Sequence, residues 1–405
     1  MNATLTALAD AIRERAQQLH TDVVMWRRHI HAHPELSFEE HDTAAFIEQQ
    51  LNRMNIPHKR IAGTGIAAMI QGKNPSSKNI ALRGDMDALP IHELNDVSYK
   101  SVNNGIMHAC GHDVHSASLL GAAAILQGLR DQFEGSIKLI FQPGEEKLPG
   151  GASLMIKEGV LENPSPATVF AQHVFPSLPA GKVGFRSGMY MASTDELYMT
   201  VKGKPGHAAM PKDYNNPLLI ASAILLRLNE TFMKEDTRLP QTHETPTVLA
   251  FGRIEGLGAT NVIPAEVKIE GTFRTMNEIW RAEAHRIMKT LAEQTAHEMG
   301  GICEFVIENG YPFLVNDPAV TERARAAAEI YLGRENVTEL ELRMTAEDFA
   351  FFSQNAPVCF YRLGTASPDG KYTAGVHTPV FDIDENALKT GSGLLAFIAL
   401  NELMS

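Results

Sequence analysis

The chain is poor in cysteine and has no long apolar run. Only three of its 405 residues are Cys, and Cys110, Cys303 and Cys359 are too scattered for a disulfide framework, which indicates a reducing compartment. No apolar stretch is long enough to span a bilayer. From Leu5 to Ile30 apolar residues recur at helical spacing with charges between them, unlike the unbroken run of a signal peptide. We therefore expect a cytoplasmic globular protein.

Basic residues are also in deficit. Lys and Arg total 36 against 48 Asp and Glu, which gives a net charge of -12. Nucleic acids and anionic membranes need basic surfaces, so neither is expected as a partner. A small anionic substrate remains possible, because a local basic pocket can coexist with an acidic surface. At 405 residues the chain exceeds the size at which one hydrophobic core keeps growing, so we expect two domains.

Potential metal ligands are concentrated in one stretch, residues 107–115. It contains Cys110, Asp113 and the three histidines His108, His112 and His115. Soft and borderline donors at this density are typical of zinc or a neighbouring transition metal. A buried Cys or a hydrogen-bonded core His explains any one of these residues alone, but not the cluster. A helix is predicted over 113–133 with Asp113 as its N-cap, and the dipole of that helix would favour a thiolate at Cys110.

Further candidate ligands follow predicted buried strands. The pairs are strand 79–83 with Asp85 and Asp87, strand 136–141 with Glu145 and Glu146, strand 168–172 with His173, and strand 358–362 with His377 in a later loop. Ligands bind beyond the carboxyl ends of strands in open α/β sheets, so we expect these side chains to converge. Asp85 and Asp87 fit turn or cap carboxylates equally well. Glu145 and Glu146 taken alone fit a solvated acidic loop.

The middle of the chain has a different pattern. Between residues 195 and 309 the predicted order is β-α-β-β-α-β, which is typical of a ferredoxin-like unit. The segments on both sides have the pattern of a three-layer α/β domain. We predict an α/β protein with a discontinuous catalytic domain, residues 1–191 and 311–405, and an inserted ferredoxin-like satellite domain, residues 192–310. In the insert, His207 lies in a Gly/Pro loop, Asn261 in a Gly-rich connection and Arg274 at a strand end, and each also fits a purely structural role.

Four motifs in a fixed order resemble a known family. They are His108-Ala109-Cys110-Gly111-His112-Asp113, Gln142-Pro143-Gly144-Glu145-Glu146, Gly206-His207-Ala208-Ala209 and Asn261-Val262-Ile263-Pro264. The chain resembles the amidohydrolase branch of the M20 metallopeptidase family, with its aminoacylases, hippurate hydrolases and plant auxin-conjugate hydrolases. The likeness covers nearly the whole chain, and the Cys distinguishes this branch from other M20 peptidases. The chain departs from the family at Gly84 and Gly144, where alanines are expected, and at Lys212, where many relatives have a second His.

The resemblance implies a two-metal site. Its implied ligands are Cys110, His112, Glu146, His173 and His377, with Glu145 as the acid/base and Zn, Mn, Co or Ni as the metals. The resemblance also places His207 near the scissile carbonyl and makes Asn261 and Arg274 candidates for binding the substrate carboxylate. It implies a homodimer through the satellite domain. The implied reaction is hydrolysis of N-acyl amino acids, N-acetyl, N-benzoyl or similar, to a carboxylate and a free amino acid.

Three other functions fit parts of this pattern. A small-peptide carboxypeptidase or dipeptidase would use the same two-metal chemistry. A thiol hydrolase with Cys110 as nucleophile would be inactivated by alkylating agents and indifferent to chelators. A structural metal site would have every coordination position closed by protein. Glu145 argues against the last, because a closed site has no use for a spare carboxylate beside a ligand.

Overall fold

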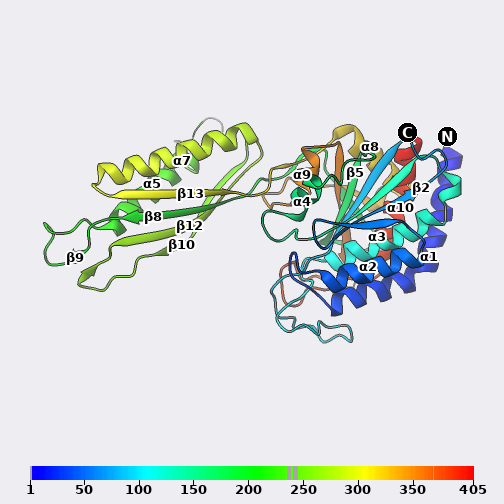
Figure 1. The fold of residues 1–405 in the computed structure, drawn as a ribbon, viewed down its shortest axis with the longest axis horizontal. Helices are drawn as coiled ribbons and strands as arrows, with labels where there is room; N and C mark the ends of the chain where they lie inside the picture. The colour runs from blue at the N-terminus through cyan, green and yellow to red at the C-terminus, as the bar shows by residue number, and fades with distance from the viewer. Residues whose placement is uncertain (1, 235–238, 240–244, 368) are drawn as a thin grey trace. The chain divides into compact units, whose positions relative to one another are not determined.

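The chain divides into two units in the computed structural model, which describes residues 2–234, 239, 245–367 and 369–405 (Figure 1). Unit 1 comprises Met1–Gly188, Val315–Glu341 and Phe351–Ser405, and unit 2 comprises Met189–Leu314 and Leu342–Ala350. The short return segment Leu342–Ala350 was not predicted as part of the insert. It belongs there because Thr345 O accepts from Ala192 N at 3.1 Å and Met344 O accepts from Arg274 Nη1 at 3.2 Å.

Unit 1 is built on an eight-stranded mixed sheet. Its order is β1 (His58–Ile61), β2 (Gly65–Gln71), β4 (Ser136–Gln142), β3 (Asn79–Asp85), β5 (Val169–Pro179), β16 (Val358–Ala366), β6 (Val183–Phe185) and β15 (Val337–Glu339). β3 is parallel to β4 and β5, and β5 is parallel to β16. β3 and β4 are buried along their whole length, which explains why they read as continuous apolar runs. β3 and β4 therefore end close to candidate ligands, whereas the prediction that a strand ends before His173 is wrong, because β5 continues to Pro179.

Helices complete unit 1. They are α1 (Asn2–Ala32), α2 (His41–Arg53), α3 (His112–Gln127), α4 (Gly151–Lys157), α8 (Pro318–Leu332) and α10 (Ala387–Met404), with short turns η1 (Arg130–Gln132), η2 (Arg334–Asn336) and α9 (Ala350–Ser353). α3 is buried on nearly all sides and packs against α1 and α10. A Cβ at Gly121 would lie 2.3 Å from Ser392 Oγ, so glycine allows α3 and α10 to approach. No helix among the described residues is long and apolar enough to cross a membrane.

Unit 2 has the predicted ferredoxin-like order. Along the chain its main elements are β8 (Asp195–Lys202), α5 (Pro217–Phe232), β10 (Thr247–Glu255), β12 (Glu266–Thr275), α7 (Glu278–Glu298) and β13 (Ile302–Asn309). The strands form an antiparallel sheet in the order β10-β12-β8-β13. Leu197, Met199 and Val201 of β8 pack with α5 and α7 in one core. The chain passes between the units at β7 (Gly188–Met191), at β14 (Leu314–Asn316) and again on both sides of Leu342–Ala350. The prediction of an α/β protein with a ferredoxin-like insert is confirmed.

A buried ion pair joins β8 to α7 inside unit 2. Asp195 is fully buried and accepts hydrogen bonds from Arg281 Nε at 3.0 Å and from His285 Nε2 at 2.8 Å. Burial raises the pKa of Asp195, but the hydrogen bonds from His285 and Arg281 outweigh burial and hold that pKa below its usual value. Because the pKa is lowered by folding, the pair stabilises unit 2 above about pH 4 and this contribution is lost as the pH falls further.

Candidate metal centre

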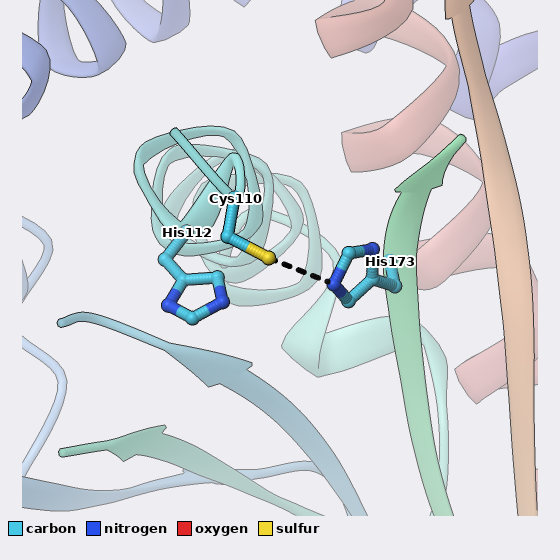
Figure 2. Close-up of side chains that lie close together, drawn as sticks. All are labelled: Cys110, His112 and His173. Carbon is cyan, nitrogen blue, oxygen red and sulfur yellow. Dashed lines mark hydrogen bonds between the residues drawn. The ribbon is translucent and has the colours of Figure 1, made fainter. Parts of the chain in front are cut away.

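Cys110, His112 and His173 come together from two elements of unit 1 (Figure 2). Cys110 lies in the turn before α3, His112 is the first residue of α3, and His173 lies in β5. All three are buried, and their potential ligand atoms lie within 4.8 Å of one another. Cys110 Sγ is 3.5 Å from His173 Nε2. A cysteine and two histidines at this spacing form a set of ligands suited to a transition metal.

A second group shares Cys110 with the first. His377 Nε2 is 3.3 Å from Cys110 Sγ and 3.2 Å from Glu146 Oε1. The three potential ligand atoms again lie within 4.8 Å of one another. The five residues predicted as ligands therefore form two overlapping triads with Cys110 in common. His377 is about half exposed, so the second triad is open on one side, as catalytic rather than structural metal sites are.

A left-handed glycine sets the turn between the first two ligands. Gly111 has φ +80° and precedes α3, and a Cβ there would lie 2.6 Å from Val174 Cγ2. The prediction that Asp113 caps α3 is wrong. Gly111 occupies the N-cap position, and Asp113 accepts instead from Arg27 Nε at 2.7 Å. His377 also has a left-handed backbone, φ +62°, and its N–H donates to Ala109 O at 2.7 Å, which ties the two ligand loops together.

Hydrogen bonds orient both buried histidines with Nε2 toward the centre. Nδ1 of His112 donates to the backbone O and to Oδ1 of Asp87, at 2.9 and 3.0 Å. Nδ1 of His173 donates to Val174 O at 2.8 Å. Asp87 also accepts from Glu146 N at 2.9 Å, so it positions two candidate ligands at once. Of the two readings left open for Asp87, the site-adjacent one is the one that its contacts support.

The unpaired polar atoms of the centre fit a cation. His112 Nε2 is buried and has no hydrogen-bond partner within the part of the chain that the structure describes, and it lies 4.0 Å from Glu146 Oε1. Burial and the Glu146 carboxylate raise the pKa of the Cys110 thiol well above its usual value. The dipole of α3 was expected to favour a thiolate at Cys110, and burial and Glu146 oppose that effect. A bound divalent ion would remove this penalty, because coordination deprotonates a thiol.

Glu145 supplies a further carboxylate next to the triads. It is buried, and its carboxylate lies within 4.8 Å of potential ligand atoms of His112 and Glu146. A carboxylate next to a metal ligand can accept and return a proton during hydrolysis.

The other predicted site residues lie in unit 2. β9 (Gly206–His207) pairs with β11 (Val262–Ile263), and Ala208 N donates to Asn261 O at 3.0 Å, so His207 and Asn261 lie on neighbouring segments. Nδ1 of His207 accepts from Ala209 N at 3.1 Å, which leaves Nε2 as the nitrogen that can donate. Arg274 lies in β12, and its guanidinium donates to Met344 O.

His115 is one of the potential ligands in residues 107–115, but it belongs to neither triad. His115 lies three residues after His112, which puts the two side chains on the same face of α3. Its Nδ1 is 2.5 Å from Asp85 Oδ1. Its position three residues after the candidate ligand His112, within one predicted helix, was the sequence signal that could have identified it.

Comparisons with known proteins agree on one family. The family model described as Peptidase family M20/M25/M40 matches residues 81–401. Thermostable carboxypeptidase 2 of Saccharolobus solfataricus is 34% identical over 97% of this chain and 98% of its own. IAA-amino acid hydrolase ILR1-like 5 of Arabidopsis thaliana is 36% identical over 93% and 86%. N-acyl-L-amino acid amidohydrolase of Geobacillus stearothermophilus is 37% identical over 76% and 81%. The crystal structure of Bacillus subtilis YXEP protein, a dinuclear metal binding peptidase, matches with TM-score 0.80 and 32% identity over 96% and 99%.

Proposed function

The chain belongs to peptidase family M20/M25/M40 and is a metal-dependent hydrolase of amide bonds, and we propose that it cleaves N-acyl amino acids to a carboxylate and a free amino acid. The observation that supports this proposal best is the pair of overlapping triads that share Cys110. Glu145 lies beside them, and the second triad opens to solvent at His377. An open metal centre with a second carboxylate beside a candidate ligand suits hydrolysis better than a structural role.

We assign the metal ligands by triad. Cys110, His112 and His173 form one set, and Cys110, Glu146 and His377 form the other. Two divalent ions, Zn, Mn, Co or Ni, would supply Lewis-acid activation of water and of the scissile carbonyl. Asp87 and the backbone of Val174 hold the ligand imidazoles with Nε2 free for coordination.

The proton transfers are assigned to Glu145. Its carboxylate accepts a proton from the water whose oxygen adds to the amide carbon. The same carboxyl then donates that proton to the leaving nitrogen as the C–N bond breaks, so the products are a carboxylate and an amine. His207 would donate from Nε2 to the developing oxyanion, and Asn261 and Arg274 would bind the substrate carboxylate.

The relatives support two substrate classes. The Geobacillus and Arabidopsis proteins are named for N-acyl amino acids and for conjugates of an amino acid, whereas the Saccharolobus protein is named a carboxypeptidase. Carboxypeptidase-like cleavage of small peptides is therefore the second candidate function. Both reactions require recognition of a carboxylate next to the scissile amide.

A substrate and metal screen tests the proposal. Protein stripped by a chelator should be inactive, and addition of Zn, Mn, Co or Ni should restore hydrolysis of N-acetyl and N-benzoyl amino acids. We expect kcat/KM for the best N-acyl amino acid to exceed that for the best dipeptide by about tenfold, or about 1.4 kcal/mol of transition-state binding. Faster dipeptide cleavage would instead establish the peptidase function. Full activity in the stripped protein would exclude the metal mechanism, and alkylation of the stripped protein would then test the thiol mechanism.

We also propose that the protein is a homodimer through unit 2. α5 exposes Leu219 and Leu226, and the edge strand β13 exposes Ile302 and Val306. Exposed leucines on a helix and exposed apolar side chains on an edge strand are each candidate association surfaces in physical terms. Sedimentation equilibrium should give about twice the chain mass of 44.4 kDa, and a monomer mass across the micromolar range would contradict the proposal.

A further inference from the structure

Val174 lies in β5, beyond the point where the neighbouring strand β3 stops pairing with β5. Its backbone N–H donates to a side chain instead of to a strand carbonyl. β3 pairs with β5 from Ala81–Val169 to Arg83–Ala171, and on its other side β5 continues along β16 past Val174. Val174 N donates to His115 Nε2 at 2.9 Å. The imidazole of His115 therefore takes the place that a strand carbonyl would occupy. It holds β5 at the residue that follows His173.

This hydrogen bond fixes the tautomer of His115. Because Nε2 accepts from Val174 N–H, the ring proton lies on Nδ1, which donates to Asp85 Oδ1 at 2.5 Å. Asp85 Oδ2 accepts from Arg83 Nη1 at 2.6 Å, and Arg83 Nε donates to Gln142 Oε1 at 2.8 Å. Asp85, His115 and Arg83 are all buried. These hydrogen bonds and charges thus fix one orientation each for the side chains of Arg83, Asp85 and His115.

Val174 is held from both sides. Its N–H is bound by His115, and its C=O accepts from His173 Nδ1 at 2.8 Å. The His173 hydrogen bond leaves Nε2 unprotonated and 3.5 Å from Cys110 Sγ. The direction in which His173 Nε2 points consequently depends on the position of the Val174 backbone.

Asp85, His112 and His115 could be read as a metal site of their own, since their potential ligand atoms lie within 4.8 Å of one another. Two observations oppose this reading. The Arg83 guanidinium is already bound to Asp85 and would repel a cation. Both ring nitrogens of His115 are already engaged, one with Asp85 and one with Val174.

We propose that Arg83, Asp85 and His115 form a positioning relay that holds the Val174 backbone and so presents His173 Nε2 to a metal ion. The relay rests on the proposed function, because it assumes that His173 is a ligand. In this assignment neither Asp85 nor His115 is a ligand of the metal ion, although Asp85 Oδ2 lies 3.8 Å from His112 Nε2. Groups that orient a metal ligand typically change metal affinity by about 10–100-fold when removed.

The test measures metal binding in three variants. His115→Ala removes the acceptor for Val174 N–H and should weaken the tighter-bound Co²⁺ by about tenfold in competition with a chelator. It should also shift the visible ligand-field bands of the Co²⁺ protein. His115→Gln places a carbonyl oxygen near the former Nε2 and should restore most of the affinity and the spectrum.

Asp85→Asn keeps the volume of the side chain and tests whether metal binding depends on the tautomer of His115. Arg83 should hold the amide oxygen, so the amide nitrogen would donate to His115 Nδ1 and force the ring proton onto Nε2. That nitrogen could then no longer accept from Val174 N–H, and the variant should reproduce the Co²⁺ phenotype of His115→Ala. If His115→Ala fails to fold, Asp85→Asn and His115→Gln still give opposite predictions for Co²⁺ affinity.

His108→Ala is the matched control. His108 is also buried beside α3, but neither of its ring nitrogens has a hydrogen-bond partner among the described residues. It should lose stability without a change in the Co²⁺ spectrum. Unchanged Co²⁺ affinity and spectrum in both His115→Ala and Asp85→Asn would overturn the relay, as would a loss of Co²⁺ stoichiometry that His115→Gln does not restore. A wild-type protein that binds Co²⁺ but hydrolyses no amide would overturn the proposed function alone.

Discussion

Glu145→Gln should lower turnover by about 10²–10⁴-fold, which is the usual contribution of general acid/base catalysis. The amide keeps the shape of the side chain but cannot accept the proton of the attacking water. Metal content should stay at the wild-type level, because the triads consist of other residues. Steady-state kinetics and elemental analysis of the same preparation measure both quantities.

Glu146→Gln is the matched control for this prediction. The substitution has the same chemistry one position later, at a residue that belongs to a triad and whose Oε1 is 3.2 Å from His377 Nε2. It should lose metal, and its activity should recover partly at high metal concentration. If the two variants exchange phenotypes, the roles of the two glutamates are reversed.

Cys110→Ala should release both ions, with metal per chain falling from about two toward zero. Cys110 is the residue that the two triads share, so its removal leaves each with two protein ligands, fewer than the three that catalytic metal sites normally use. His173→Ala and His377→Ala each disturb one triad and should each lower the content by about one ion. Elemental analysis after gel filtration measures the difference.

Cys303→Ala provides the control for loss of a buried thiol. Cys303 is a free, buried cysteine in β13 of unit 2 and belongs to neither triad. This variant should keep both ions and full activity. A Cys110→Ala protein that keeps its metals but loses activity would instead indicate a nucleophilic thiol, the second mechanism that the sequence leaves open.

The ends of β3 and β4 were predictable because buried parallel strands have a strong local pattern, whereas β5 continues past His173 to Pro179. Continuous apolar runs identified β3 and β4, and two carboxylates, Asp85 at the end of β3 and Glu145 after β4, were expected at the carboxyl edge of the sheet. The order of elements in unit 2 was equally predictable, because apolar residues recur with different periods in its helices and in its strands. Local patterning therefore predicted the framework of the site.

Features that depend on distant contacts were not predictable in this way. Asp113 looked like a helix cap by position, but a buried arginine 86 residues away binds it. The left-handed backbone of His377 has no local signal, and its assignment as a ligand rested on the family resemblance. The return of Leu342–Ala350 to unit 2 is set by hydrogen bonds to Ala192 and Arg274, which are far away in the sequence.

The position of β16 in the sheet has a consequence for biosynthesis. β16 is the last strand of the chain, yet it lies between β5 and β6, which are made before unit 2. Unit 2 can therefore fold on the ribosome while the sheet of unit 1 still has a gap beside the strand that bears His173. His377 follows β16, so the second triad remains incomplete until the segment after β16 has emerged. Nascent chains will thus expose the unpaired edge of β5 until β16 has been made, and we expect the two-metal centre to be completed only after His377 has emerged.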